Sequence, residues 1–359
     1  MVLNTLLQCP DCKRLLPFTS DKTTITVCNA CGTIVWRQND GSVIVKPQFL
    51  LQDKNDIIQP GTTGSWNGKT FTVLGRFRAW FEEFIFNYWT IQFNDNEIAW
   101  LAEGYGIYSI LEPIPLPDNV SSRSLQSLTP GHQTQLQPDK MFTVREKETA
   151  VKWEIEGELF VPDPESSFLL LDLQSDDGQH ICIFEWGKSN ITAYKTDYVT
   201  FSSLSLQHLK EHRYSDRSFM CKQCSHPVKV KTFPYAQSCA CAECGACYSM
   251  EDGGQFYKDD KKPVKHSIHL ALYSAGIINS ISYEVVGYAR KEEINEYHSQ
   301  WTEYTLFNPS EGFAFLSEYE GNWIYVREEM NSPIISNQNI KEFEFDKEPF
   351  HLFNSYKHK

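Results

Sequence analysis

The sequence predicts a mainly β protein in which two zinc ribbons are each followed by a small antiparallel β-sheet or barrel, as an internal duplication. Three observations support this fold class. The chain of 359 residues is rich in aromatic residues (23 Phe, 17 Tyr and 9 Trp), which favour strands over helices. Short alternating apolar and polar runs are separated by turn signals such as Asn67-Gly68. A pattern of paired cysteines also occurs twice at nearly the same spacing.

Most of the eleven cysteines form Cys-x-x-Cys pairs. Each pair places two thiolates on one tight turn, and two pairs complete a tetrahedral zinc site. Segments of this size bury too little apolar surface to fold alone, so we expect bound zinc to supply the folding free energy. The predicted ligands of two structural zinc ions are Cys9, Cys12, Cys28 and Cys31 for the first, and Cys221, Cys224, Cys241 and Cys244 for the second.

Redox dithiols or buried free thiols are the alternative interpretations of these pairs. A redox pair begins a helix within a βαβ unit, and no such pattern flanks these cysteines. Cys239 and Cys247 crowd the second site, but the repeat spacing aligns them with Thr26 and Ile34, so we predict that neither is a ligand. We expect the lone Cys182 to be a buried apolar residue. Sites with four thiolates are coordinatively closed, which is typical of structural rather than catalytic zinc.

Charge and composition bound the compartment and the partners. The formal net charge of −13 opposes binding to a phosphate backbone, so nucleic-acid binding is disfavoured unless a local basic patch exists. The sequence shows no signal peptide, and no apolar run approaches the roughly 20 residues that span a bilayer. Paired cysteines in such a chain indicate metal thiolates rather than disulfides, and hence a reducing compartment, the cytoplasm.

The similarity between the two halves extends beyond the cysteines. An offset of 212 residues aligns Gly75 with Gly287 and Trp89 with Trp301, and from Leu101 onward the offset becomes 215. We interpret the change as a small insertion in a loop between strands. The predicted order is zinc ribbon 1 (1–48), β module 1 (49–216, with a Pro/Ser-rich loop over 113–139), zinc ribbon 2 (217–255), β module 2 (256–330) and a tail (331–359).

Two local patterns suggest chemistry at first sight. The segment from Gly64 to Thr70 is similar to a phosphate-binding loop, but it lacks the first glycine and leads into a strand-like run. We therefore expect a hairpin turn there. His208 and His212 would share one face of a short helix over 204–212, which is a metal-like spacing. Because no third ligand lies nearby in sequence, we interpret them as solvated residues.

Several runs in the second half resemble the bacterial domain of unknown function 4178. They are residues 285–287 (Val-Val-Gly), 301–307 (Trp-Thr-Glu-Tyr-Thr-Leu-Phe) and 315–323 (Phe-Leu-Ser-Glu-Tyr-Glu-Gly-Asn-Trp), with less typical versions at 89–93 and 101–106. The resemblance covers most of 9–210 and 221–328. It implies a β-rich fold with a zinc ribbon ahead of the domain, and it implies no agreed activity. Gene neighbourhood in the family associates such chains with polyamine aminopropyltransferases, small multi-helix membrane proteins and phage-shock-type proteins.

Three classes of function are compatible with these observations. The favoured class is a non-enzymatic adaptor, in which closed ribbons and tandem β modules display surfaces to protein partners, such as the aminopropyltransferases or membrane-associated stress proteins named above. The second is a nucleic-acid contact through basic residues of the ribbons. The third is an enzyme that uses carboxylates such as Glu103 and Glu318, although no nucleophile–base pair or open metal site is apparent. The tail is expected to be a mobile end or a short docking strand.

Overall fold

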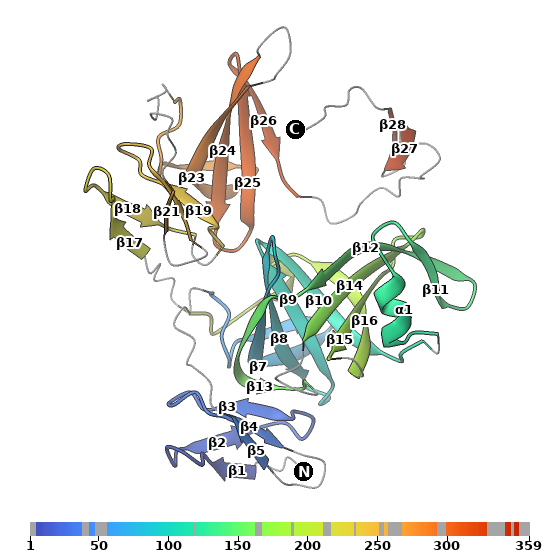
Figure 1. Cartoon of the computed structure of the whole chain (residues 1–359). Helices are drawn as coiled ribbons and strands as arrows, with labels where there is room; N and C mark the ends of the chain where they lie inside the picture. The colour runs from blue at the N-terminus through green and yellow to red at the C-terminus, as the bar shows by residue number, and fades with distance from the viewer. Residues whose placement is uncertain are drawn as a thin grey trace.

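The computed structural model describes residues 5–37, 43–46, 56–117, 119–161, 167–187, 190–210, 217–232, 235–250, 255–257, 268–292, 299–328, 342–345 and 348–351. Within these ranges the chain is almost entirely β, which confirms the predicted fold class. Figure 1 shows the first ribbon at one end, a large curved sheet in the middle, and the second ribbon and a second sheet at the other end.

The strands are short in the ribbons and longer in the sheets. The first ribbon has β1 (Thr5–Gln8), β2 (Leu15–Phe18), β3 (Ile25–Val27), β4 (Ile34–Arg37) and β5 (Val43–Lys46). The central part has β6 (Thr63–Trp66), β7 (Lys69–Trp80), β8 (Ile85–Phe93), β9 (Ile98–Gly104), β10 (Ile107–Ile114), α1 (Ser122–Ser127), β11 (Gln133–Gln137), β12 (Lys140–Thr149), β13 (Lys152–Leu159), β14 (Phe168–Ser175), β15 (His180–Trp186), β16 (Asn190–Val199) and a 3₁₀ turn, η1 (Ser202–Leu204).

The second half of the chain has the same order of parts. The second ribbon has β17 (Arg217–Met220), β18 (Pro227–Val230), β19 (Ser238–Ala240), β20 (Cys247–Ser249) and β21 (Gln255–Tyr257). The second sheet has β22 (Ala275–Ile278), β23 (Ile281–Glu292), β24 (Gln300–Asn308), β25 (Gly312–Tyr319) and β26 (Asn322–Val326). A hairpin of β27 (Glu342–Phe345) and β28 (Glu348–His351) ends the described chain.

The large sheet curls because β12 and β13 are joined by two residues but pair with strands at opposite ends of it. The strand order between them is β12-β14-β15-β16-β10-β9-β8-β7-β13. At the link, the N–H of Ala150 donates to the carbonyl of Phe168 at 2.9 Å, and the N–H of Val151 donates to the carbonyl of Trp80 at 2.8 Å. The sheet is therefore drawn round into a half-barrel that is closed at this corner (Figure 1).

Alternate residues of the strands build separate cores on the two faces of this barrel. The inner core is aromatic: the Phe77 ring lies 4.9 Å from that of Phe168 and 4.8 Å from that of Trp186. Outside, one core forms where η1 and the residues around Ile58 cover β7 to β10. Another forms where Leu125 of α1 covers β12, β14, β15 and β16. Period-two alternation thus gives the curved sheet an apolar interior and a covered exterior.

The first ribbon is fastened to the barrel through β13. Residues Glu158 and Leu159 pair with β3, so the ribbon strands continue the large sheet. Glu158 is buried, and its carboxylate accepts hydrogen bonds from the backbone N–H (2.9 and 3.0 Å) and hydroxyl (2.8 Å) of Thr19. It also accepts one from the hydroxyl of Thr23 at 3.0 Å. A buried carboxylate is stable only with such a complete set of donors.

The second sheet repeats the first five strands of the barrel in order and register. The bounds of β7 and β23 differ by 212 residues, and those of β8 and β24 by 215. Both β7 and β23 carry a bulge at the same position, next to Gly75 and Gly287. The insertion therefore lies between these strands, and the alignment of Trp89 with Trp301 is wrong. Strand register places Trp89 opposite Leu101, as it places Tyr304 opposite Leu316.

The two sheets share one core and differ in the other. Trp89 and Tyr304 are both fully buried in matching outer cores. On the face that is the barrel interior in the first half, Tyr88 is buried, whereas the equivalent Glu303 is only half-buried. Trp100 is fully buried, whereas the equivalent Phe315 is 44% exposed. The second sheet lacks counterparts of β12 to β16 within the described residues and stays open.

Three local expectations need comment. The hairpin turn over 64–70 is confirmed, because β6 pairs with β7 and both Asn67 and Gly68 have positive φ. The Pro/Ser-rich segment 113–139 is not simply a loop, since it contains the end of β10, α1 and β11. The helix predicted over 204–212 is wrong within the described residues, because η1 ends at Leu204 and His208 has a φ of 58°. His212 lies outside the described residues. In the tail, β27 and β28 pair with each other.

Replacement of Glu158 by alanine should loosen the first ribbon. The substitution leaves the donors of Thr19 and Thr23 without their acceptor, so we expect the free energy of unfolding to fall by roughly 2–4 kcal/mol in urea titrations. Glu154→Ala on the same strand is the matched control. Its partly exposed ion pair with Lys152 contributes little, and its loss should change stability by less than about 1 kcal/mol. Equal effects of the two variants would contradict the assignment.

Candidate metal centres

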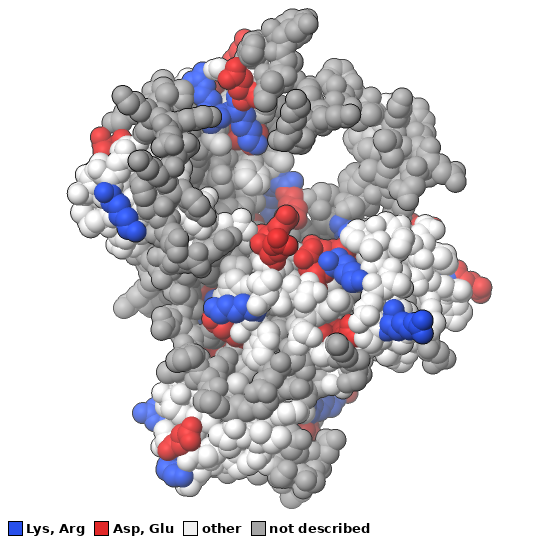
Figure 2. Space-filling view, in the orientation of Figure 1, with Lys and Arg blue, Asp and Glu red and all other residues white. Residues whose placement is uncertain are grey.

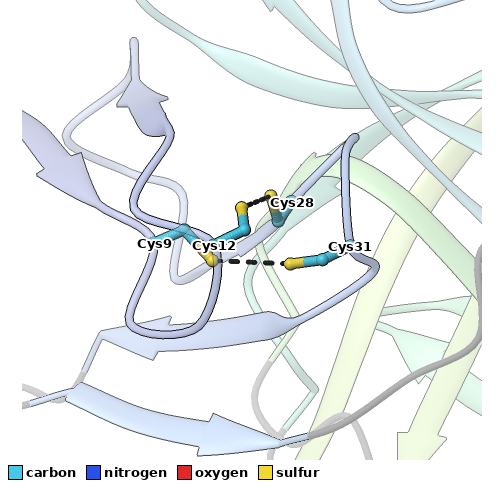
Figure 3. Close-up of side chains that lie close together, drawn as sticks. All are labelled: Cys9, Cys12, Cys28 and Cys31. Carbon is cyan, nitrogen blue, oxygen red and sulfur yellow. Dashed lines mark hydrogen bonds between the residues drawn. The ribbon is translucent and has the colours of Figure 1, made fainter.

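The structure gathers the four cysteines of the first ribbon around one point (Figure 3). The sulfur of Cys9 lies 3.6 Å from that of Cys31, and the sulfur of Cys12 lies 3.5 Å from that of Cys28. All four sulfurs are within 4.8 Å of one another. These distances are too long for disulfides, whose sulfurs are about 2.05 Å apart.

The second ribbon forms an equivalent cluster. The sulfur of Cys221 lies 3.6 Å from that of Cys244, and the sulfur of Cys224 lies 3.6 Å from that of Cys241. The first cysteine of each pair is buried in both ribbons. The two clusters are the groups of converging donors that the described residues contain, and each could hold one metal ion.

One backbone turn is used at all four Cys-x-x-Cys pairs. The N–H of the first cysteine donates to the carbonyl five residues later at 2.8 or 2.9 Å, and its own carbonyl accepts from the N–H four residues later. The residue directly after the second cysteine of each pair, which supplies that N–H, has positive φ, a conformation that glycine adopts without strain. These residues are Lys13 (62°), Gly32 (77°), Ser225 (58°) and Gly245 (72°). The turn points both sulfurs of a pair the same way.

The clusters fit zinc by chemistry and by distance. Zinc bonds to thiolate at about 2.3 Å, so four ligands in a tetrahedron lie about 3.8 Å apart. The 3.5–3.6 Å pairs and the 4.8 Å upper limit bracket that spacing. Four soft sulfur donors without an oxygen or nitrogen donor also favour zinc over magnesium or calcium.

Polar neighbours favour the thiolate form of one cysteine in each cluster. A hydrogen bond with the hydroxyl of Thr33, at 3.1 Å, lowers the pKa of Cys31 to about 6. Burial opposes ionisation of Cys221, but the hydroxyl of Tyr248 donates to its sulfur at 3.1 Å, and the pKa of Cys221 is lowered to about 6. Such partners orient the ligands of a metal.

The extra cysteines lie beside the second cluster but do not converge on it. Cys239 is opposite Tyr248 in the strand register, and its sulfur lies 3.7 Å from that of Met250. Cys247 is exposed, and its thiol contacts the carbonyl of Gly245 at 3.5 Å. Cys182 is buried in the wall of the barrel, far along the chain from either ribbon.

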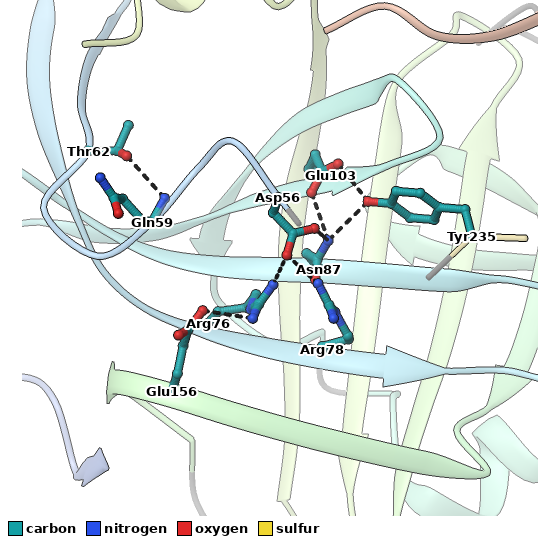
Figure 4. Close-up of polar contacts among 9 residues, drawn as sticks. All are labelled: Asp56, Gln59, Thr62, Arg76, Arg78, Asn87, Glu103, Glu156 and Tyr235. Carbon is teal, nitrogen blue, oxygen red and sulfur yellow. Dashed lines mark hydrogen bonds and ion pairs between the residues drawn. The ribbon is translucent and has the colours of Figure 1, made fainter. Parts of the chain in front are cut away.

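A buried network of charged residues joins the second ribbon to the barrel (Figure 4). Arg76 and Arg78, which are almost fully buried on β7, both form ion pairs with Asp56. Asn87 accepts from Arg78 at 2.8 Å and donates to Glu103 at 2.8 Å. The hydroxyl of Tyr235, which lies between β18 and β19, donates to the other oxygen of Glu103 at 3.0 Å. The sequence signals of this network are the alternation of arginine with apolar residues on β7 and the carboxylate of Glu103, which sequence analysis considered for catalysis.

Burial and charge shift the two acids of the network in opposite directions. Burial would raise the pKa of Asp56, but the Coulomb attraction of Arg78 and Arg76 outweighs it and lowers the pKa to about 2. Burial, and then repulsion by Asp56, raise the pKa of Glu103 to about 6. Glu103 is buried, and its carboxylate already accepts hydrogen bonds from Asn87 and Tyr235. Such an arrangement is typical of a structural carboxylate.

The carboxylates that sequence analysis considered for catalysis are not brought together. Glu103 is held by Asn87 and Tyr235, whereas Glu318 accepts from the N–H of Gly321 at 3.1 Å and lies 3.4 Å from Nδ1 of His269. Each stays on its own sheet, on β9 or β25. The Glu103 network instead serves as a junction, where the Tyr105 ring lies 4.8 Å from that of Tyr235 and 5.8 Å from that of Phe313.

Loss of one ligand should cost one metal ion. We expect the purified protein to contain two zinc ions per chain by inductively coupled plasma mass spectrometry, and Cys28→Ser or Cys241→Ser to contain one, because three thiolates and a hydroxyl bind zinc poorly. Cys247→Ser is the control, since this thiol lies beside the second cluster without converging on it. Two ions in Cys28→Ser, or one in Cys247→Ser, would contradict the assigned ligands.

The acidic network should leave a signature in the pH dependence of stability. The pKa of Glu103 is raised from 4.5 to about 6 on folding, so its contribution is fully present below about pH 4.5 and is lost as the pH rises through 6. Glu103→Gln removes this loss. Urea titrations should therefore show the variant gaining stability relative to the parent between about pH 4.5 and 7. Glu97 is exposed, so the free energy of unfolding of Glu97→Gln should follow that of the parent at every pH. If the free energy of Glu103→Gln also runs parallel to that of the parent, the assigned role of Glu103 is wrong.

Comparison with known proteins gives one match. A family model described as a domain of unknown function (DUF4178) matches residues 59–201 and 274–359, which is more than half of the chain. These ranges contain the barrel and the second sheet, and neither cysteine cluster. No curated protein and no solved structure matches the chain. The helices of the described residues are too short or too polar to cross a bilayer. By the extent of the match, the chain belongs to the DUF4178 family.

Proposed function

We propose that the protein is a non-enzymatic adaptor in which two zinc ions stabilise the ribbons and the second β module accepts an added strand from a protein partner. We further propose that the chain arose by duplication of a ribbon-plus-sheet unit, with the domains bounded as predicted from the sequence. The use of cysteine as metal thiolate supports a reducing compartment, the cytoplasm.

The observation that carries this proposal is the free edge of β26. The equivalent strand of the barrel, β10, pairs with β16 over seven residues from Tyr108 to Ile114. Among the described residues, β26 pairs with β25 alone. Edge strands of native proteins usually carry charge, proline or a bulge that blocks further pairing. The β26 sequence, Asn-Trp-Ile-Tyr-Val, has none of these devices.

The side chains of β26 support the same conclusion. Ile324 is 62% exposed, and Trp323 and Val326 are nearly half exposed. Within the barrel, the residue equivalent to Trp323 is Tyr108, which is 3% exposed because Phe201 and the end of β16 cover it. The relation of β10 to β16 is thus an internal template for the occupant of β26: one extended segment that runs antiparallel to it.

Charge argues against the nucleic-acid alternative. On the face shown in Figure 2, lysine and arginine side chains are scattered among acidic ones and form no continuous stripe. Lys231 of the second ribbon forms an ion pair with Glu284, and Lys13 of the first donates to the carbonyl of Pro10 at 2.6 Å. The net charge of −13 repels the phosphate backbone of a nucleic acid, whose binding depends on electrostatic attraction.

A charge introduced at the edge of β26 should weaken partner binding. The first candidates are the polyamine aminopropyltransferases and phage-shock-type proteins that family gene neighbourhoods suggest, each tested as a purified protein by calorimetry. Ile324→Lys should weaken binding by roughly tenfold or more, because a charge at the strand edge opposes pairing. Ile277→Lys is the matched control, since Ile277 is 76% exposed on β22 at the opposite edge of the same sheet. Equal effects of the two variants, with unchanged circular dichroism, would exclude strand addition at β26.

A further inference from the structure

The barrel contains a cavity that no other feature of the protein explains. It has a volume of about 300 Å³, and residues of β8, β9, β10, β12, β14, β15 and β16 line it. Its inner wall includes Tyr88, Leu111, Leu170 and Cys182, which belong to the aromatic core of the barrel. Glu328, which follows β26 and is exposed, lies at its rim. This volume is at the lower end of the range for small-molecule sites.

The polar side of the cavity carries more negative than positive charge. Glu146, Asp172 and Glu328 contribute three carboxyl groups, and Arg145 contributes the one guanidinium of the lining. That guanidinium lies 3.7 Å from the carboxylate of Asp172, so these two opposite charges partly neutralise each other. Burial, and then repulsion by Asp172, raise the pKa of Glu146 to about 7. A positive charge placed between the two acids would relieve this repulsion.

Thr196, a residue of the cavity lining, has a buried hydroxyl without a hydrogen-bond partner. Thr196 of β16 lines the cavity and is 8% exposed, and its Oγ1 makes no hydrogen bond. Buried polar atoms in native proteins are nearly always paired, so an orphan in a cavity wall is a mark of a missing donor or acceptor.

The remaining wall is aromatic. Phe84, Phe86, Tyr105 and Tyr198 line the cavity together with Tyr88. Aromatic faces attract organic cations through their quadrupole, and they exclude water from the apolar part of a ligand. A metal ion suits this wall less well. Among the described residues, converging metal donors occur in the two cysteine clusters and not here.

We propose that the barrel cavity binds a small organic cation, in which an ammonium group on an apolar body lies between Glu146 and Asp172. The body of the ligand packs against the aromatic wall. The two acids that hold the ammonium group lie on the barrel strands β12 and β14, whereas strand addition is proposed at β26 of the second sheet, which adjoins the cavity through Glu328.

The open second sheet agrees with this division of roles. It lacks counterparts of β12, β14, β15 and β16 among the described residues, and β12 and β14 supply Glu146 and Asp172 of the cavity. At the position of Tyr88, it has Glu303, which is engaged by Lys291. The cavity therefore exists once per chain among the described residues, in the half whose sheet is curled.

The probes are hexylamine, 1-hexanol and hexanoate, titrated calorimetrically into the full-length protein. They share one apolar body and differ in charge. Hexylamine should bind roughly tenfold or more tightly than 1-hexanol, and hexanoate more weakly than either, because the cavity carries excess negative charge. If 1-hexanol matches hexylamine, or hexanoate binds best, the assigned ligand class is wrong.

Two further measurements test the role of Glu146. Glu146→Gln should reduce the affinity for hexylamine to that for 1-hexanol, while Glu112→Gln should leave it unchanged. Glu112 follows Leu111 on β10, so its side chain points to the opposite face of that lining strand. The same charge change at the two sites separates a local from a general effect of charge, and equal losses of affinity would overturn the proposal.

The role of Glu146 can also be tested in the parent protein, without a substitution that could change the fold. Its affinity for hexylamine should fall as the pH is lowered from about 8 to about 6, because Glu146 becomes protonated and neutral. An affinity that is constant over this range would overturn the role of Glu146. The other ionisable groups that face Glu146 or line its surroundings are Asp172 and His180, Arg145 and Glu148, Cys182, Tyr198 and Glu328.

Discussion

The two-residue link between β12 and β13 is the constraint on which the rest of the molecule depends. Because these strands pair with opposite ends of one sheet, the sheet must curl until its ends meet at Ala150 and Val151. Curling creates an interior, and the interior holds the aromatic core and the cavity. It also leaves β13 free to continue beyond the corner and pair with the first ribbon. The curled barrel, its cavity and the attachment of the first ribbon thus follow from one short connection.

The second half of the chain shows what the same strands do without that link. Five strands keep their order, their bulge and their outer core. The face that would be interior has Glu303 where the barrel has Tyr88, and Phe315 is exposed. A sheet with a partly polar concave face gains little by closing, because burying a carboxylate costs more than burying a neighbouring phenylalanine recovers. The free edge of β26 follows from this openness, and it supports the proposed adaptor role.

The second ribbon, the barrel and the second sheet are in direct contact with one another. Tyr235 reaches from the second ribbon to Glu103 in the barrel, and its ring packs on Tyr105. The carbonyl of Tyr105 also accepts from the N–H of Phe313 in the second sheet, at 3.3 Å. The second ribbon, the barrel and the second sheet therefore meet at two hydrogen bonds, one from Tyr235 to Glu103 and one from the N–H of Phe313 to the carbonyl of Tyr105. If zinc holds the second ribbon in shape, the same zinc helps to hold Tyr235 in place at this junction.

The β class, the two sets of four cysteines that converge and the hairpin at Asn67-Gly68 could be predicted from sequence, because each depends on residues close together in the chain. The sequence also indicated a repeat, although it placed the insertion after Trp89 rather than between β7 and β8. The other features became apparent in the folded chain. The Asp56 network, the cavity beside Glu146 and the free edge of β26 join residues that lie tens to more than a hundred positions apart. Their contacts arise from strand order, which local spacing and propensity do not encode.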